Sequence, residues 1–237
     1  MALFWSLVFV DPLILLSTAF FGTLSVIASL FDKKGNAMMT LARVWARSLL
    51  AIAGVRVTVE GLEKLTPGAS YVFASNHLSY MDSPVILSYV HADFRFMAKS
   101  GLFKIPLLGT HLGQAGHIPV PREDPRAAVK TMTLAADTIR TRNISLLIFP
   151  EGGRSHDGQL RPFKDGAAYI AIKAGVSIVP VAIRGTREIL AMHSATFHRG
   201  SVTLRIGDPI PAAGITLQDR KSLTEAVRSQ VVAMLSR

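Results

Sequence analysis

One feature constrains the fold of this chain more than any other: a long apolar stretch near its start. From Pro12 to Phe31, 20 consecutive residues carry no charge. As a helix, about 20 such residues match the hydrocarbon thickness of a bilayer. The stretch lacks the positive leading region, short apolar segment and small-residue cleavage site that are typical of a signal peptide. The sequence therefore predicts a retained membrane anchor.

The anchor can adopt two forms. A helix can break at the Asp11–Pro12 step, so the anchor is either one span or two apolar helices lying in a single leaflet. Four cations follow the apolar stretch, namely Lys33, Lys34, Arg43 and Arg47. Because cations flank the cytoplasmic end of membrane segments, we expect the rest of the chain on the cytoplasmic face of a membrane, the inner membrane in a bacterium.

A basic amphipathic helix is predicted to follow the anchor. The stretch "AMMTLARVWARSLLAIAG" has apolar residues at helical spacing and ends at Gly54, a residue suited to closing a helix. Its arginines are expected either at the level of the lipid headgroups or on a solvated face. We therefore divide the chain into an anchoring helical segment, residues 1–53, and one further domain, residues 54–237.

Strand-like and helix-like stretches alternate in the second part of the chain. The predicted strands are "VRVTVEG", "SYVFAS", "FRFMAK", "GHIPV", "ISLLIFP", "SIVPVAI" and "SVTLRIGDPI". The predicted helices span residues 84–91, 102–112, 125–141, 165–174, 186–192 and 216–235. This alternation predicts an α/β fold with a mixed, largely buried sheet flanked by helices.

Composition narrows the classes of partner. Lys and Arg number 26 against 16 acids, a net charge of +10 that favours an anionic partner such as nucleic acid, a membrane surface or a phosphorylated substrate. A nucleic-acid binder would explain the charge but not the anchor, so we expect no nucleic-acid partner. The absence of cysteine excludes disulfides, thiolate metal sites and a cysteine nucleophile. No histidine has metal-ligand spacing with carboxylates, so neither a metal nor a cofactor is expected.

The stretch "SNHLSYMDSP" places His77 five residues before Asp82. In a regular helix two such side chains point apart, so they can meet only if the backbone turns between them. Ser83 suits the cap of a helix and Pro84 its first position, which predicts a strand, a tight loop and then a helix. A histidine and a carboxylate would then converge at the start of this helix.

Three further polar clusters follow predicted strands. Lys99 comes directly after one strand and Arg122 after another. The third cluster, "FPEGGRS", contains Glu151, Gly152, Gly153, Arg154 and Ser155. Paired glycines let the backbone approach an anion, and an arginine offers phosphate a planar fork of donors. Because the loops that leave the strands of an α/β sheet usually bind the ligand, we expect these clusters to form one site.

Taken in order, these motifs resemble those of the 1-acyl-glycerol-3-phosphate acyltransferases, also called lysophosphatidate acyltransferases. "NHLSYMD", "GHIPVPR" and "FPEGGRS" are similar to the first three blocks of that family, and "IVPVAI" before Arg184 is similar to the fourth. The resemblance covers nearly the whole chain. Two positions depart from the family pattern, Gly153 where threonine is usual and Leu78 where glutamine is frequent.

The residues themselves indicate a mechanism for acyl transfer to an alcohol. His77 would take the hydroxyl proton as general base, and Asp82 would hold the other ring nitrogen. The chain has no G-x-S-x-G nucleophile motif, so the attacking hydroxyl would belong to the substrate. Lys99, Arg122 and Arg154 would bind the acceptor phosphate. We expect Glu151 to orient an arginine or the acceptor hydroxyl, and backbone N–H groups near the glycines or after His77 to face the oxyanion.

The resemblance implies the substrates. The acceptor would be lysophosphatidate in the bilayer, the donor acyl-CoA or acyl carrier protein, and the product phosphatidate for phospholipid synthesis. Two alternatives stay open. One is an acyltransferase for another acceptor, such as glycerol 3-phosphate, a lysophospholipid or a lyso-ornithine lipid. The other is a non-catalytic module that binds anionic lipid through its basic face.

Overall fold

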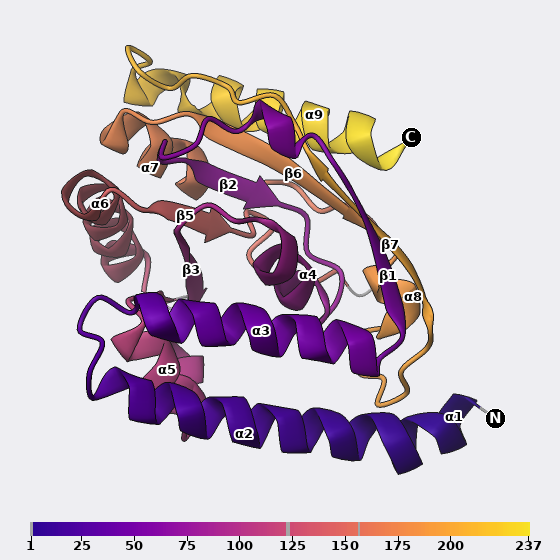
Figure 1. Ribbon diagram of the computed structural model, residues 1–237. Coiled ribbons are helices and arrows are strands. Elements are labelled where there is room, and N and C mark those ends of the chain that lie inside the picture. The colour runs from indigo at the N-terminus through magenta and orange to yellow at the C-terminus, as the bar shows by residue number, and fades with distance from the viewer. Residues whose placement is uncertain (1, 122–123, 156) are drawn as a thin grey trace.

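A mixed β-sheet forms the centre of the structure, a computed structural model that describes residues 2–121, 124–155 and 157–237 (Figure 1). Its strands are β1 (Val55–Glu60), β2 (Val72–Ser75), β3 (Phe94–Lys99), β4 (Ile118–Val120), β5 (Ser145–Ile148), β6 (Ile178–Arg184) and β7 (Gly200–Ile206). They lie in the order β1–β7–β6–β2–β5–β3–β4, and each neighbouring pair is parallel except β6 and β7. The predicted α/β fold with a mixed sheet is confirmed.

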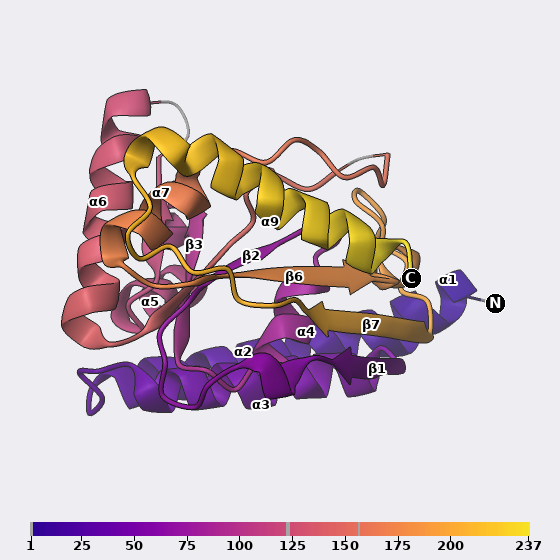
Figure 2. The same ribbon diagram turned by 90° about the horizontal axis from the view of Figure 1, so that it is seen from above.

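Helices cover both faces of this sheet, because successive residues of a strand point to opposite sides. One core lies between the sheet and the helices α3 and α4, and Phe73 of β2 belongs to it. The other lies under α6, α7 and α9, and contains Val72 and Ala74 of the same strand. Figures 1 and 2 show the two layers from directions at right angles. The helices are α3 (Asn36–Ile52), α4 (Asp82–Tyr89), α6 (Pro125–Arg142), α7 (Gly166–Ala174) and α9 (Arg220–Leu235).

The largest differences between predicted and observed helices are at residues 102–112, 186–192 and 216–235. The helix predicted at 102–112 is divided into a 3-10 helix η3 (Ser100–Lys104) and α5 (Leu108–Gln114), because Pro106 lies between them and disfavours a helical residue before it. The helix predicted at 186–192 is the single turn α8 (Thr186–Ile189). The last helix begins at Arg220, after the short 3-10 helix η4 (Leu217–Asp219), and not at residue 216. Another 3-10 helix, η2 (Leu62–Lys64), follows β1.

The N-terminal apolar stretch forms one continuous helix from α1 (Ala2–Trp5) through a π-helical turn η1 (Ser6–Val10) to α2 (Asp11–Ser29). The possible break at Asp11–Pro12 is therefore not found. Pro12 cannot donate to a carbonyl one turn earlier, and the wide π-helical turn before it accommodates the missing bond. Within the described residues, Leu3–Ser29 is the one helix long and apolar enough to cross a membrane by length and composition.

α3 runs back along α2 and packs its apolar face on the sheet side, as predicted for an amphipathic helix (Figure 1). Its two arginines reach backbone carbonyls, and of the two Arg43 is half-buried while Arg47 is exposed, as expected for a solvated face. Arg43 donates to the carbonyls of Val90 (2.5 Å) and Ala92 (2.7 Å), and Arg47 donates to that of Ser88 (3.3 Å). Both cations therefore satisfy carbonyls at the end of α4, the end of a helix that favours positive charge. The division at residues 53 and 54 stays a prediction.

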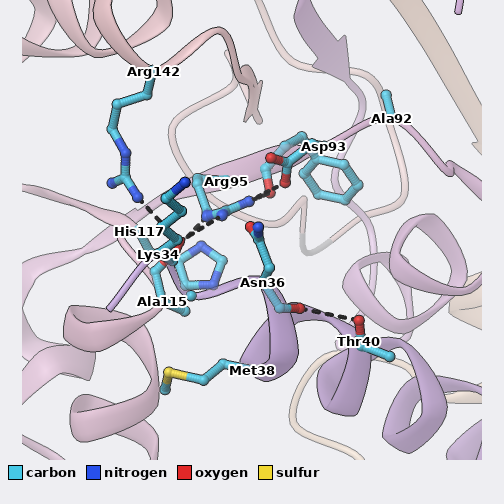
Figure 3. A network of polar contacts seen from close by, with 12 residues as sticks. Lys34, Asn36, Met38, Thr40, Ala92, Asp93, Arg95, Ala115, His117 and Arg142 are labelled. Atoms are coloured by element: carbon cyan, nitrogen blue, oxygen red, sulfur yellow. Dashed lines mark hydrogen bonds and ion pairs between the residues drawn. The ribbon is translucent and has the colours of Figure 1, made fainter. Parts of the chain in front are cut away.

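Another cation, Arg95, fixes the turn between α2 and α3 to the sheet (Figure 3). Arg95 of β3 is almost fully buried, at 1% exposure, and donates to the carbonyls of Ala115 (2.5 Å) and Lys34 (3.4 Å). It also forms an ion pair with Asp93. Arg142, at the end of α6, donates to the same Lys34 carbonyl at 3.1 Å. The helical hairpin is thereby held to the amino end of β3.

Candidate active site

The candidate site lies where several parallel strands end. β2 is paired in parallel with both β5 and β6, and β5 with β3, so their carboxyl ends reach the same edge of the sheet. β2 leads into the loop that carries His77, β5 into Glu151 and the glycines, and β6 into Thr186. This edge is where an open α/β sheet usually binds its ligand. The predicted clusters are thus brought together by strand pairing.

His77 and Asp82 meet as the sequence predicts. The His77 Nδ1 lies 2.7 Å from the Asp82 Oδ2, and the same oxygen accepts the backbone N–H groups of Leu78 (2.7 Å) and Ser79 (2.8 Å). These bonds turn the chain sharply. As a result α4 begins at Asp82, two residues before the predicted start at Pro84, and the cap position belongs to Met81 and not to Ser83.

The second oxygen of Asp82 is held as well. The Thr186 hydroxyl donates to Oδ1 at 2.5 Å, and both side chains are fully buried. Asp82 therefore cannot rotate away from the imidazole without losing bonds on both oxygens. The His77 ring also stacks on Phe149, with centroids 3.8 Å apart and planes at 12°. With Nδ1 bonded to the carboxylate, a neutral His77 has Nε2 as its proton acceptor.

Glu151 supports the histidine through the backbone. Its Oε1 accepts the His77 N–H at 2.6 Å, and its Oε2 accepts the Arg161 N–H at 2.8 Å. Burial raises the pKa of this carboxyl above its ordinary value, and the two N–H donors oppose that rise. The sequence led us to expect that Glu151 orients an arginine side chain or the acceptor hydroxyl. In the structure it fixes the position of the loop that carries His77.

Arg154 lies against the same loop from the other side. Its Nε donates to the Ser79 carbonyl at 3.2 Å, and its guanidinium lies 4.0 Å from the centre of the Tyr80 ring. The next residue, Ser155, donates its backbone N–H to the His77 carbonyl at 3.0 Å. The loop after β5 and the loop after β2 are therefore bonded to each other, with a cation at their junction.

The two glycines provide room in this junction. Gly152 has a φ of +76°, a conformation that side chains rarely adopt. A Cβ at this position would lie 2.9 Å from the Lys164 Nζ, so the glycine lets a second cation approach the loop. Gly153 follows in the same turn and precedes Arg154.

The two remaining predicted site residues are less closely placed. Lys99 ends β3 at the same edge, exposed and two strands from β2, which corresponds to about 10 Å between strand axes. Arg122 lies outside the described residues.

Comparison with known proteins identifies the family. The family model described as Acyltransferase matches residues 56–184, more than half of the chain. The chain belongs to the acyltransferase family. Its predicted resemblance to the 1-acyl-glycerol-3-phosphate acyltransferases is confirmed by named relatives and by a solved structure.

The relatives of this acyltransferase come from plants, animals and bacteria. The chloroplastic 1-acyl-sn-glycerol-3-phosphate acyltransferase LPAT1 of Arabidopsis thaliana is 36% identical over 172 residues, 72% of this chain and 48% of that protein. The human 1-acyl-sn-glycerol-3-phosphate acyltransferase alpha is 29% identical over 196 residues, 83% of this chain and 69% of that protein. The chain thus spans about half the length of the plant relatives it matches.

A solved structure matches the acyltransferase over its whole length. The crystal structure of the 1-acyl-sn-glycerophosphate (LPA) acyltransferase PlsC from Thermotoga maritima superposes with a TM-score of 0.81 at 27% sequence identity. The match covers 100% of this chain and 97% of that chain. It therefore includes the apolar N-terminal helix as well as the sheet.

Sequence reasoning missed three residues that shape the site of this acyltransferase. They are Thr186, Phe149 and Asn76. The Asn76 side-chain amide donates to the Ile183 carbonyl at 2.9 Å and accepts the Ile183 N–H at 2.8 Å. Each of the three residues lies at or just beyond the end of a strand, which is the signal that could have found them. Among the described residues, no group of three or more His, Cys, Asp or Glu side chains could hold a metal ion.

Proposed function

We propose that this chain is a 1-acyl-sn-glycerol-3-phosphate O-acyltransferase. It transfers a fatty acyl group from acyl-CoA or acyl carrier protein to the free hydroxyl of lysophosphatidate and so makes phosphatidate. The names of the relatives support this acceptor. The observation that carries the proposal is the His77–Asp82 pair, 2.7 Å apart at the carboxyl edge of the sheet with Arg154 beside it.

The geometry suits general base catalysis. Asp82, fixed by four donors, holds the imidazole by Nδ1 and stabilises the imidazolium that forms. His77 removes the acceptor's hydroxyl proton through Nε2 while the oxygen attacks the thioester carbon. The carbon–oxygen bond forms, the carbon–sulfur bond breaks, and the proton on His77 passes to the leaving thiolate. A base of this kind accelerates a reaction by about 10²- to 10⁴-fold. Holding the two substrates together contributes much of the remaining rate enhancement.

Cations at the junction of the two loops would bind the acceptor phosphate. Arg154 is held by Ser79 and Tyr80 within the His77 loop, so its charge is oriented before substrate arrives. We assign Lys99 to the same phosphate as a longer-range partner, and we keep the assignment of Arg122 to this phosphate that the sequence suggests. Gly152, Gly153 and Ser155 would line the acceptor on the backbone side. Glu151 would act as a positioning residue, because it bonds the amide of His77.

The N-terminal helix accounts for how such a site reaches its substrate. Lysophosphatidate and phosphatidate stay in the bilayer, and the Leu3–Ser29 helix exposes large apolar side chains over most of its length. We propose that this helix attaches the enzyme to the cytoplasmic face of a membrane, with the soluble donor arriving from the cytosol. The net charge of +10 would favour both anionic donors.

The test is thiol release by purified protein in detergent. Acyl-CoA or acyl carrier protein is the donor, and lysophosphatidate is compared with glycerol 3-phosphate, lysophosphatidylcholine and lyso-ornithine lipid. Turnover with lysophosphatidate that falls at least 100-fold in His77→Ala is the expected result. Turnover only with another acceptor would overturn the proposed substrate. A His77→Ala variant as active as wild type would overturn the proposed base.

A further inference from the structure

A cavity lies at the edge strand β1, away from His77. It has a volume of about 420 Å³, within the range of small-ligand sites. Seven residues from three parts of the chain line it: Trp5, Ala51, Ile52, Gly54, Val55, Arg56 and Arg199. We call it the Arg56–Arg199 cavity. Both arginines are exposed, so the cavity opens to the outside.

The walls of this cavity carry positive charge only. Arg56 and Arg199 are its charged lining residues, and within the described residues neither forms an ion pair with a carboxylate. Asp11, the acid of the neighbouring apolar helix, accepts a hydrogen bond from the Ser6 hydroxyl instead. Two arginines that line one cavity without a carboxylate are suited to phosphate, which guanidinium groups bind with paired N–H donors.

Arg199 is held in place before any ligand binds. Its guanidinium lies over the Trp5 ring, 4.6 Å from the ring centre. Its aliphatic stem packs on Gly54, where a Cβ would meet the Arg199 Cγ at 2.9 Å. Gly54 closes α3 with a φ of +67°, so the helix end leaves room for the arginine. Such pre-organisation lowers the cost of binding.

The cavity adjoins an exposed apolar surface at the start of the N-terminal helix. Beyond Trp5, large apolar side chains stand exposed on α1 and η1: Leu3, Phe4, Leu7, Val8 and Phe9, between 47% and 67%. Tryptophan is enriched where a membrane meets water, and arginine there binds lipid phosphates. A ligand with a phosphate in the cavity would therefore have an apolar surface beside it for its hydrocarbon chains.

This place is distinct from the candidate active site. β1 is separated from β2 by β7 and β6, which corresponds to about 14 Å. The segment between α8 and β7 joins the two places and contacts η1 through Ser6 (Figure 1). At its start the Leu190 carbonyl accepts the Ser79 hydroxyl, and near its end the Phe197 N–H donates to Ser6.

We propose that the Arg56–Arg199 cavity binds the phosphate-bearing headgroup of an anionic glycerophospholipid, with the acyl chains lying along α1 and η1. The bound lipid is a neighbour in the membrane and not the acyl acceptor. It fixes the height and rotation of the protein on the bilayer, because it connects the start of the apolar helix to the edge strand of the sheet.

Tryptophan fluorescence can place the ligand, since the chain contains two tryptophans and Trp45→Phe leaves Trp5 as the single reporter. The protein in non-ionic detergent is titrated with dihexanoyl-phosphatidylglycerol, dihexanoyl-phosphatidylcholine and inorganic phosphate. A saturable change with the phosphatidylglycerol, and binding at least tenfold weaker for the other two, is expected. Equal binding of inorganic phosphate would overturn the lipid assignment. Equal binding of the phosphatidylcholine would overturn the preference for net negative charge.

A pair of double variants separates this site from general surface charge. Arg56→Gln with Arg199→Gln removes two cations from the cavity, and Arg140→Gln with Lys173→Gln removes two exposed cations from α6 and α7. Binding is measured by the rise of the unfolding temperature with added phosphatidylglycerol, a readout that does not depend on catalysis. The cavity variant is expected to bind about 10- to 30-fold more weakly, and the control as wild type.

Two outcomes would overturn the proposal. Equal weakening in both double variants would mean that the lipid responds to net charge alone. The second outcome would mean that the two arginines only stabilise the fold, by complementing the end of α3. The cavity variant would then unfold at a lower temperature without lipid yet keep the full lipid-induced rise.

Discussion

Two buried polar networks lie at opposite edges of the same sheet, and they differ in what their charged groups contact. At the carboxyl edge, Asp82 binds two backbone N–H groups, the Thr186 hydroxyl and the imidazole of His77. At the amino edge, Arg95 binds backbone carbonyls and Asp93 (Figure 3). Both charges are saturated with partners, as buried charges must be.

The difference is that only the first network ends on a group able to react. His77 is 8% exposed and its imidazole can act as a general base, whereas Arg95 is 1% exposed and its guanidinium only donates hydrogen bonds. A buried charge whose hydrogen bonds are all satisfied therefore does not by itself mark a catalytic site. The carboxyl edge differs because its buried charge, Asp82, positions the imidazole of His77. The two networks should respond differently to substitution.

The largest effect is expected from Asp82→Asn. The asparagine amide cannot accept the imidazole proton and the two N–H groups as the carboxylate does, so His77 would favour the wrong tautomer. We expect kcat to fall by about 10⁴-fold, as for a base that loses its orienting carboxylate. Steady-state kinetics on lysophosphatidate, beside circular dichroism to verify folding, provide the measurement. A folded variant with kcat within tenfold of wild type would contradict the role of Asp82.

The matching change in the other network is Arg95→Met. It leaves the Ala115 carbonyl without its donor and Asp93 without its ion-pair partner, whereas the Lys34 carbonyl keeps its bond from Arg142. We expect the free energy of unfolding to fall by about 3–5 kcal/mol, the usual cost of removing one partner of a buried charged group. In the fraction that stays folded, kcat should stay within about twofold of wild type. Urea unfolding measures the stability of the variant, and kinetics normalised to the folded fraction measure its kcat. A loss of kcat without a loss of stability would contradict the purely structural role of Arg95.

Acid should destabilise the region around Arg95 through two neighbouring histidines, since His117 accepts the Phe96 N–H and the His111 ring lies 5.6 Å from that of His117. Burial lowers the pKa of His111 to about 4, and burial also lowers the pKa of His117 well below its ordinary value, with Arg95 adding to both shifts. The unfolded chain takes up these protons near pH 6.5, while the folded protein does not. Stability is therefore full above about pH 6.5 and falls as the pH drops toward 4, by about 3 kcal/mol for His111 alone.

Unfolding by urea at pH 7.5, 6.0 and 5.0 measures this slope. His117→Gln removes one titrating group, and the glutamine oxygen can still accept the Phe96 N–H that the His117 Nδ1 accepts at 2.8 Å. Its stability should therefore depend less on pH than that of wild type. His91→Gln, at an exposed histidine, is the matched control. A stability that does not change between pH 7.5 and 5.0 in wild type would contradict the assignment.

Local patterns and long-range contacts differ in how far the sequence could predict them. The His77–Asp82 meeting was predictable because the turn between them is encoded within six residues. The α/β alternation, the amphipathic face of α3 and its end at Gly54 were predictable for the same reason. In contrast, the first residues of α4 and α9 depend on bonds made by loop side chains, and they differ from the prediction by two and four residues.

Contacts between distant parts of the chain could not be predicted. Arg43 and Arg47 have the same helical spacing whether they face lipid headgroups or the carbonyls that end α4. The partner of Glu151 is a backbone amide 74 residues away, so its residue type alone suggested an arginine or a hydroxyl. Continuity of the helix through Pro12 depends on a π-helical turn, which has no sequence signature of its own.

Thr186 is the clearest of these cases, because strand pairing brings its hydroxyl to a carboxylate 104 residues earlier in the chain. It touches no predicted substrate, so it acts through Asp82 as a positioning residue. Thr186→Val keeps the shape but leaves one carboxylate oxygen without a donor. Since a hydrogen bond to a charged group contributes about 1.5 kcal/mol or more, kcat should fall roughly tenfold with KM unchanged.

Thr186→Ser separates positioning from packing. Serine keeps the donor and loses a methyl group, so it should restore most of kcat while lowering the free energy of unfolding by about 1 kcal/mol. Valine should do the reverse, keeping the methyl packing and losing turnover. If both variants lost kcat equally, or if valine lowered only the unfolding temperature, Thr186 would contribute to the core alone. The catalytic function of the carboxyl edge would then depend on His77 and Asp82 alone, and not on the Thr186 hydroxyl that holds Asp82.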